Sequence, residues 1–263
     1  MRQFILCALV TVAAHAAAQA PAKKTPAPSS AEFNSNVESL GPNFRPHDIL
    51  AVLQVMPKPP TKGEFEKAEE FEARKTRWAE AAFLGQLRPS SVFAFDLNPA
   101  LEQRSLKSTY DADKEILNVR IDTQYEFLNG STAEWIETYL SIANKGVRPA
   151  VTRMGVKFQV EHVECSHVGI ALTNTLSTST FEVPMAAAEA RAAKQRLAIL
   201  LLVQLDGPFS IRGEARRNTA SLDDPVERRR VFFGLWGHVQ EAWLYDRPTG
   251  RIYQKVSMTP PIK

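Results

Sequence analysis

Residues 115–130, EILNVRIDTQYEFLNG, decide the fold class that this sequence predicts. Apolar and polar side chains alternate along this segment, so every second residue faces the same way. The apolar face holds Leu117, Val119, Ile121, Tyr125 and Phe127. Period-two alternation predicts a strand with one buried and one wet face, which is typical of an antiparallel sheet. The Asn129-Gly130 pair near its end is a strong signal for a tight hairpin turn.

Several neighbouring segments are expected to extend this sheet. They are residues 107–111, which face 115–121 across a turn at 111–114, residues 131–146 after the hairpin, residues 228–239, and two short strands within 241–256 around a turn at 246–250. The apolar run at residues 197–203 predicts a further strand that is buried on both faces. Strands at this density, separated by short turns, favour a sheet-rich domain.

Two helices are also expected. Residues 61–87 place one apolar arc on a helical wheel, and Thr61 is suited to cap the start of the helix. The arc consists of Phe65, Ala68, Phe71, Trp78, Ala79, Ala82 and Phe83. Residues 184–197 are rich in alanine, and they predict either a helix followed by the buried strand or one long buried helix; we favour the first. The predicted fold is α+β, mainly antiparallel β-sheet with an N-terminal amphipathic helix and a second helix packing on the sheet.

The N-terminal sixty residues differ in composition from the rest. Residues 1–20 combine Arg2, a short apolar run and the exit Ala18-Gln19-Ala20, which predicts a secretory signal peptide of bacterial style and a periplasmic or secreted protein. Residues 21–60 hold eight of the 17 prolines and predict a proline-rich tether. Within it, residues 49–56 are expected to form a short strand or helix that docks on the body. Residues 61–263 are expected to form a single α+β globular domain.

Charge and hydropathy narrow the range of partners. The chain has 32 Lys+Arg and 29 Asp+Glu, so removal of Arg2 with the signal peptide leaves 31 against 29, a formal net charge of +2. This near balance argues against nucleic acid as a partner. The longest apolar run of the mature chain, at 197–203, is far shorter than the roughly 20 residues of a transmembrane helix, so no transmembrane segment is expected there.

Residues 160–169, VEHVECSHVG, contain the candidate catalytic and metal-binding residues. Cys165 is the only cysteine outside the predicted signal peptide, so it forms no internal disulfide, and it pairs with His167 as a candidate thiol nucleophile and base. His162, Cys165 and His167 are the candidate metal ligands. In a regular strand His162 faces away from the other two, so we favour a strand that carries a buried thiol and polar residues, with a β-bulge near His162.

Two other groups of residues are candidates for binding. Arginines of the kind that hold planar anions are concentrated at Arg212, Arg216, Arg217, Arg228, Arg229 and Arg230, with acids interspersed. Trp236 and Trp243 either line a groove or pack across strands. Nucleophile-elbow, zinc-protease, phosphate-loop and dinucleotide motifs are absent from the sequence.

These features lead to a hypothesis of a soluble, non-enzymatic binding module of the cell envelope, without a cofactor. Its partner is an envelope protein or an anionic envelope component. The alternatives are an enzyme that uses Cys165 with a histidine, and a metal-binding protein centred on His162, Cys165 and His167.

Overall fold

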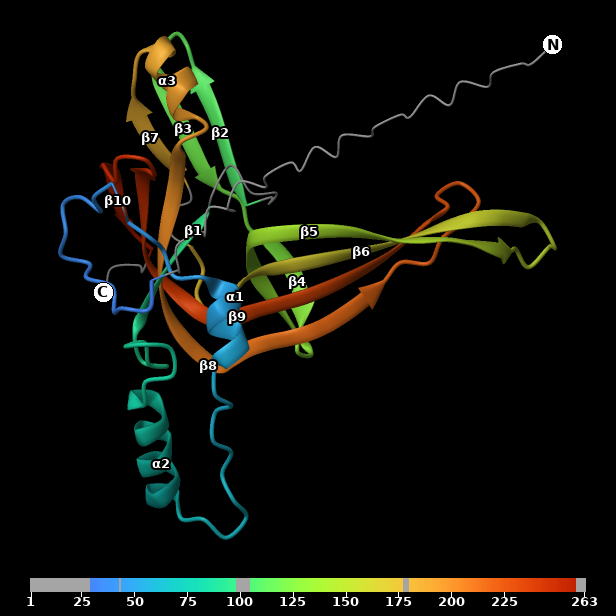
Figure 1. The fold of residues 1–263 in the computed structure, drawn as a ribbon, viewed down its shortest axis with the longest axis horizontal. Helices are drawn as coiled ribbons and strands as arrows, with labels where there is room; N and C mark the ends of the chain where they lie inside the picture. The colour runs from blue at the N-terminus through green and yellow to red at the C-terminus, as the bar shows by residue number, and fades with distance from the viewer. Residues whose placement is uncertain (1–28, 43, 98–104, 177–179, 259–263) are drawn as a thin grey trace, which may run out of the picture.

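A computed structural model describes residues 29–42, 44–97, 105–176 and 180–258. The predicted signal peptide, residues 1–20, and the first part of the predicted tether lie outside these ranges. The described chain is a mixed α/β fold dominated by sheet, as the alternation at residues 115–130 predicts. Figure 1 shows the two sheets, with long strands that extend well beyond the centre of the molecule.

The larger sheet has seven strands in the order β1-β8-β9-β6-β5-β4, and β10 also pairs with β9. Its strands are β1 (Val92–Leu97), β4 (Gln124–Leu128), β5 (Ser131–Val151), β6 (Lys157–Leu172), β8 (Leu197–Arg217), β9 (Val226–Asp246) and β10 (Ile252–Ser257). Neighbouring strands are antiparallel except β6 and β9, which form a parallel ladder. The predicted sheet is thus largely antiparallel, and the parallel ladder is a feature that the sequence did not indicate.

The smaller sheet has the order β2-β3-β7, and its strands are β2 (Leu106–Asp111), β3 (Ile116–Ile121) and β7 (Thr180–Pro184). The expected pairing of 107–111 across the turn is confirmed as β2 with β3. Helix α3 (Ala187–Ala193) follows β7, and its Ala190 and Ala193 are buried. The helix-then-strand interpretation is confirmed, because β8 begins at Leu197 directly after α3.

The segment 115–130 divides between the two sheets. The expectation of one strand with one apolar face is confirmed only for β3, where Leu117, Val119 and Ile121 are buried. In β4, Tyr125 and Phe127 of the predicted apolar face are 77% and 49% exposed, whereas Glu126 and Leu128 are buried, the reverse of the prediction. Residues 122–123 lie in neither strand, and β3 and β4 belong to different sheets, so the alternation of β3 does not continue into β4.

The turn after β4 matches its prediction. Asn129 and Gly130 both have positive φ, 50° and 84°, as a two-residue type I′ turn requires. They connect β4 to β5, whose facing residues are Leu128 and Ser131.

The N-terminal amphipathic helix differs from its prediction. Helix α2 (Ala68–Glu80) begins seven residues after Thr61 and buries none of its residues, and Phe65 is 93% exposed. Figure 1 shows that α2 projects from the body. Its main aromatic contact is Trp78, which meets the Phe209 ring edge-on at 4.7 Å. The apolar arc was too sparse to secure the helix against the sheet, so the prediction that α2 covers the sheet is wrong.

A different helix covers the sheet. Helix α1 (Ile49–Val55) lies within the predicted tether, and Ile49, Val52, Leu53 and the following Met56 are buried in the main core. The expectation of a short docking element at residues 49–56 is thereby confirmed as a helix. Asp48 caps it by accepting a hydrogen bond from the Leu50 N–H at 2.9 Å.

His47 anchors the chain directly before α1. Its ring is buried, the Ala94 N–H donates to Nδ1 at 2.9 Å, and Nε2 lies 2.9 Å from the Ala31 carbonyl oxygen. An accepting Nδ1 and a donating Nε2 are the neutral tautomer. Burial lowers the pKa of His47 below its ordinary value of 6.5, and the hydrogen bond to Ala31 offsets part of that effect.

We expect acid to destabilise the docked N-terminal segment through His47. The unfolded chain takes up a proton near pH 6.5, whereas the folded chain resists it, so stability falls as the pH drops below about 6.5. His47→Gln removes this titration while keeping a donor and an acceptor. Urea unfolding at a series of pH values between neutral and mildly acidic should therefore show a shallower pH slope for the variant. Equal slopes for the two proteins would contradict this role.

Candidate functional site

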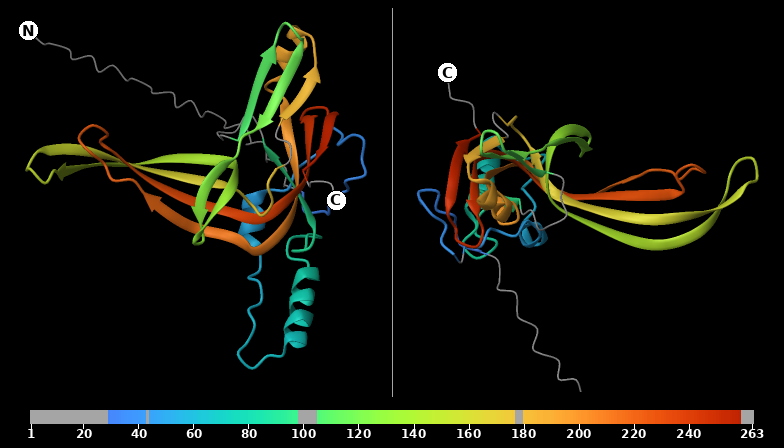
Figure 2. Two further views of the ribbon diagram at one scale, coloured as in Figure 1. Left: turned by 180° about the vertical axis from the view of Figure 1, so that it is seen from behind. Right: turned by 90° about the horizontal axis from the view of Figure 1, so that it is seen from above.

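The outer parts of four strands form an arm. We define the arm as residues 140–151 of β5, 157–166 of β6, 212–217 of β8 and 226–231 of β9. Figures 1 and 2 show that the arm points away from α2 and from the smaller sheet. Strands of 21 residues span about 70 Å at roughly 3.3 Å per residue, far more than a core of this size covers.

One groove lies on the arm, with a volume of about 340 Å³. We call it the arm groove, and it is lined by Lys145, Gly146, Val147, Arg148, His162, Val163, Glu164, Arg217, Glu227 and Arg229. Strand pairing places its residues together: His162 faces Glu227, Glu164 faces Arg229, and Arg229 faces Arg217. Facing residues share one side of a sheet, so these side chains project from the same face.

Two glutamates organise the charges of the arm groove. Glu227 lies 3.1 Å from Arg217 Nε, 3.3 Å from Arg148 Nη2 and 3.6 Å from His162 Nδ1. Glu164 is paired with Arg229 and lies 3.4 Å from Lys145 Nζ. Four cationic side chains thus surround two carboxylates, and the groove has a formal excess of two positive charges with His162 neutral.

The acids of the groove are recessed and the bases are accessible. The Glu227 side chain is 14% exposed, whereas Arg148 and Arg217 are 62% and 63% exposed. The Arg229 guanidinium beside Glu164 holds the pKa of that carboxyl below its ordinary value; burial opposes this effect and Lys145 adds to it. A guanidinium has five N–H donors, and a single ion pair uses a minority of them. The cations can therefore keep their glutamates and still donate to an incoming anion.

The comparisons with known proteins were negative. No protein-family model matches this chain. No curated protein matches it, and neither does any solved structure. Function is therefore inferred from the chemistry of the arm groove and of the surfaces around it.

The predicted binding arginines divide between the two faces of the sheet. Arg217 and Arg229 line the arm groove. Arg228 and Arg230 alternate with Arg229 and lie on the opposite face, where Arg228 pairs with Asp224 at 2.8 Å and Arg230 with Glu126 at 3.2 Å. Arg216 is also on that face: it faces Arg230 in the ladder.

Arg230 and Arg216 help to fold the sheet over on itself. The pairing of Arg230 with Glu126 joins β9 to β4, although β6 and β5 lie between them. At the β4–β5 turn, the Asn129 N–H donates to Glu214 of β8 at 2.5 Å. The guanidinium of Arg216 lies over the Phe127 ring, 5.3 Å from its centroid. These arginines thus have structural partners.

Trp236 and Trp243 do not form a groove. Trp236 is 7% exposed and packs with Trp135, Phe232 and Ile211. Trp243 is fully buried in another cluster, where the Phe33 ring meets it edge-on at 5.4 Å. The strand that carries them is long enough to pass through both cores.

The three residues proposed as metal ligands have separate surroundings. His167 is buried, its Nδ1 lies 2.5 Å from Glu137 Oε2, and its ring stacks on Phe232 at 4.8 Å. His162 opens into the arm groove, and Cys165 is partly exposed on the opposite face. Within the described ranges, no three His, Cys, Asp or Glu residues gather in a way that suits a metal ion. His167 also directs its ring nitrogen to Glu137.

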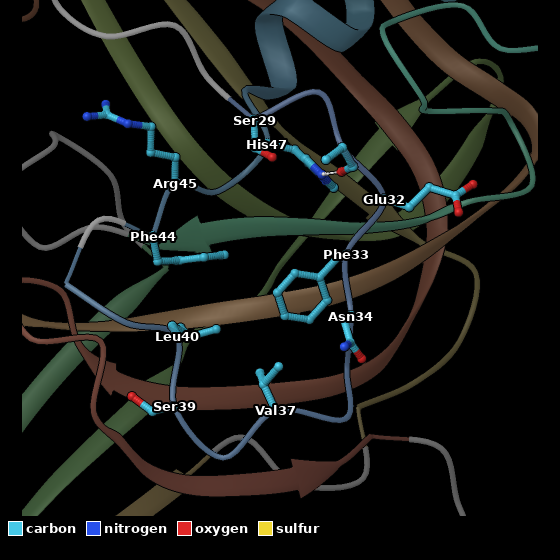
Figure 3. Close-up of a pocket in the computed structure, with 11 residues that line it drawn as sticks. Ser29, Glu32, Phe33, Asn34, Val37, Ser39, Leu40, Phe44, Arg45 and His47 are labelled. Atoms are coloured by element: carbon cyan, nitrogen blue, oxygen red, sulfur yellow. Dashed lines mark hydrogen bonds between the residues drawn. The ribbon is translucent and has the colours of Figure 1, made fainter.

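A second cavity lies in the N-terminal segment, with a volume of about 390 Å³. Figure 3 shows Phe33, Leu40 and Phe44 around it, with His47 at one end. Its charged lining residues are Glu32 and Arg45, and Glu32 accepts a hydrogen bond from the Ser91 hydroxyl at 3.2 Å. A single loop supplies its walls, so this cavity is a weaker candidate than the arm groove, whose residues come from four strands.

Sequence reasoning missed Lys145, Arg148, Glu164 and Glu227 as members of one site. A bulge in β5 between Asn144 and Gly146 turns Lys145 out of the regular ladder, opposite His162 and Val163. The expected irregularity near His162 is present, but the extra residue lies in the partner strand. Gly146 has φ of 104° and donates its N–H to Asn144 Oδ1 at 2.7 Å. The Asn-Lys-Gly triplet was the available signal.

Among the described helices, none is both long and apolar enough to cross a membrane.

Proposed function

We propose that this chain is an exported, non-enzymatic binding protein of the bacterial cell envelope, and that it holds an acidic group of its partner in the arm groove. The predicted signal peptide supports export. The observation that carries the proposal is the groove itself, where four accessible cations surround two recessed glutamates. The partner is a protein with an acidic segment or an anionic component of the envelope.

The geometry favours binding over chemistry. The cations come from separate strands and are held by shared carboxylates, so their guanidinium and ammonium groups are oriented before a ligand binds. Arginine suits planar carboxylate and phosphate groups because two parallel N–H bonds reach two oxygens. The His162 ring adds a polar edge to the groove, 3.6 Å from Glu227.

The arm groove should bind simple anions in solution. In an NMR titration of isotope-labelled protein with poly-glutamate or inorganic phosphate, we expect the chemical shift of the Gly146 amide to change, because Gly146 lines the groove. Arg217→Ser/Arg229→Ser should weaken binding by roughly a hundredfold or more, since hydrogen bonds to charged groups contribute about 1.5–3 kcal/mol each. Added salt should weaken binding to the wild type as well.

Arg228→Ser is the matched control for this titration. Arg228 neighbours Arg229 in sequence but faces the other way and pairs with Asp224. The control should bind poly-glutamate as the wild type does. A wild type that shows no shift at Gly146, or a control that loses as much affinity as the groove variant, would refute the proposal.

A further inference from the structure

The end of the arm has a composition of its own. We call residues 147–158 the hairpin tip, where β5 turns into β6. Val147, Val151, Met154 and Val156 are 61%, 60%, 92% and 49% exposed there. Single exposed apolar residues are ordinary on a protein surface, but four gathered at one projecting end are not.

The charge of this region has one sign. Residues 138–160 contain no Asp or Glu, and their charged residues are Lys145, Arg148, Arg153 and Lys157. The chain as a whole is nearly balanced, with 32 bases and 29 acids, so this segment is a local exception. Apolar side chains flanked by cations match a surface that is negative outside and apolar beneath, which describes an anionic lipid bilayer.

The hairpin tip is ordered before any contact. The Thr152 N–H donates to the Val156 carbonyl at 2.8 Å, and the Gly155 N–H donates to the Thr152 carbonyl at 2.9 Å. The Thr152 hydroxyl accepts from the Val156 N–H at 3.0 Å. These bonds satisfy backbone groups that would otherwise cost free energy on leaving water. Gly155, with φ of 86°, allows the turn that places Met154 at the apex.

The outer edge of β5 is poorly suited to pairing with another strand. Among the described residues, β4 pairs with β5 only at 131–135, which leaves 136–151 as an edge. This edge carries a bulge at Lys145 and a proline at Pro149, both of which discourage pairing with another strand. The tip therefore fits a bilayer better than an added strand.

We propose that the hairpin tip docks on the surface of an anionic lipid bilayer, with Val151, Met154 and Val156 entering the interface and Arg153 and Lys157 contacting lipid phosphates. Figures 1 and 2 show this tip as the outermost part of the arm, where the rest of the molecule does not obstruct a flat surface. None of these five docking residues lines the arm groove, so docking does not depend on the groove having a ligand.

Vesicle flotation with the purified mature chain tests the proposal. The wild type should float with vesicles of phosphatidylcholine and phosphatidylglycerol. With vesicles of phosphatidylcholine alone, it should remain in the bottom fraction of the gradient. Arg153→Ser/Lys157→Ser should lower the partition by roughly twenty-five-fold, at about fivefold per cation near the surface. Met154→Asp/Val156→Asp should abolish binding while thermal unfolding stays unchanged, because both side chains are exposed.

Phe65→Asp is the control, since Phe65 is 93% exposed and lies three residues before α2, the helix that Figure 1 shows away from the arm. It should float as the wild type does, and so should Arg217→Ser/Arg229→Ser, which separates tip docking from groove binding. Failure of the wild type to float with the anionic vesicles would overturn the proposal. So would tip variants that float normally, or a Phe65→Asp variant that loses flotation to the same extent.

Discussion

Gly169→Ala is expected to lower the free energy of unfolding by about 3 kcal/mol or more, at the upper end of what overpacking costs. A Cβ at this position would lie 2.2 Å from the Ile136 carbonyl oxygen and 2.7 Å from Cζ2 of Trp135. Trp135 is fully buried, and Gly169 faces Gly234 of β9 across the parallel ladder. The indole crosses both glycines, so neither the ring nor the backbone has room to move.

Gly234→Ala should behave alike, because its Cβ would lie 2.5 Å from the Gly169 carbonyl oxygen and 2.7 Å from Cη2 of Trp135. Gly63→Ala is the control: its nearest neighbour, the Glu66 Cβ, is at an ordinary 3.5 Å. Urea unfolding should show a stability of the Gly63 variant within about 0.5 kcal/mol of wild type. Wild-type stability in the Gly169 and Gly234 variants would show that the contact between Trp135 and the glycines is not tight.

The buried pair of Glu137 and His167 is expected to produce the second large effect. Glu137 is fully buried, His167 is 3% exposed, and their contact is 2.5 Å. Glu137→Ala should destabilise the fold by about 3–5 kcal/mol, because removal of one partner leaves the other in a site of low polarity. His167→Ala should cost a similar amount and also lose the stacking on Phe232. The measurement is chemical unfolding of both single variants.

The double variant Glu137→Leu/His167→Leu separates the pair from its surroundings. It is expected to cost much less than the sum of the single variants, since replacing both partners of a buried polar contact by apolar residues of similar shape is nearly neutral. His238 and Asp206, 3.0 Å apart but 32% and 43% exposed, provide the control cycle. Their coupling energy should be below about 1 kcal/mol. Additive effects at Glu137 and His167 would argue against the pair as a unit.

The strands of the arm were only partly predicted from local sequence pattern. Strands were expected at residues 131–146, 160–169 and 228–239, whereas the continuation of β5 to Val151 and of β8 to Arg217 was not. Residues 228–239 and the first half of 241–256 were expected as separate strands, yet they form the single strand β9. Gln240, the residue between them, is a bulge in the β8–β9 ladder, and pairing continues on both sides of it: Val239 faces Val203 and Glu241 faces Leu202.

Local sequence by itself determined the sheet-rich composition, the β2–β3 pairing, the passage from α3 to β8, and the docking element at residues 49–56. Each depends on periodicity or turn chemistry within a few residues, which is where local preference is strong. The one-sided charge at the end of the arm can also be read from the sequence, because residues 138–160 contain no Asp or Glu.

Only the tertiary structure decided which arginines share a site, which helix covers the sheet, and where Tyr125 points. Arg217 and Arg229 meet because β8 and β9 are adjacent, and Arg148 joins them because a bulge in β5 sets its register. A single inserted residue changes the face of every residue after it. The register between distant strands is set by packing in the core. Trp135, for example, lies across Gly169 and Gly234. Contacts of this kind join residues far apart in sequence, which a local pattern cannot connect.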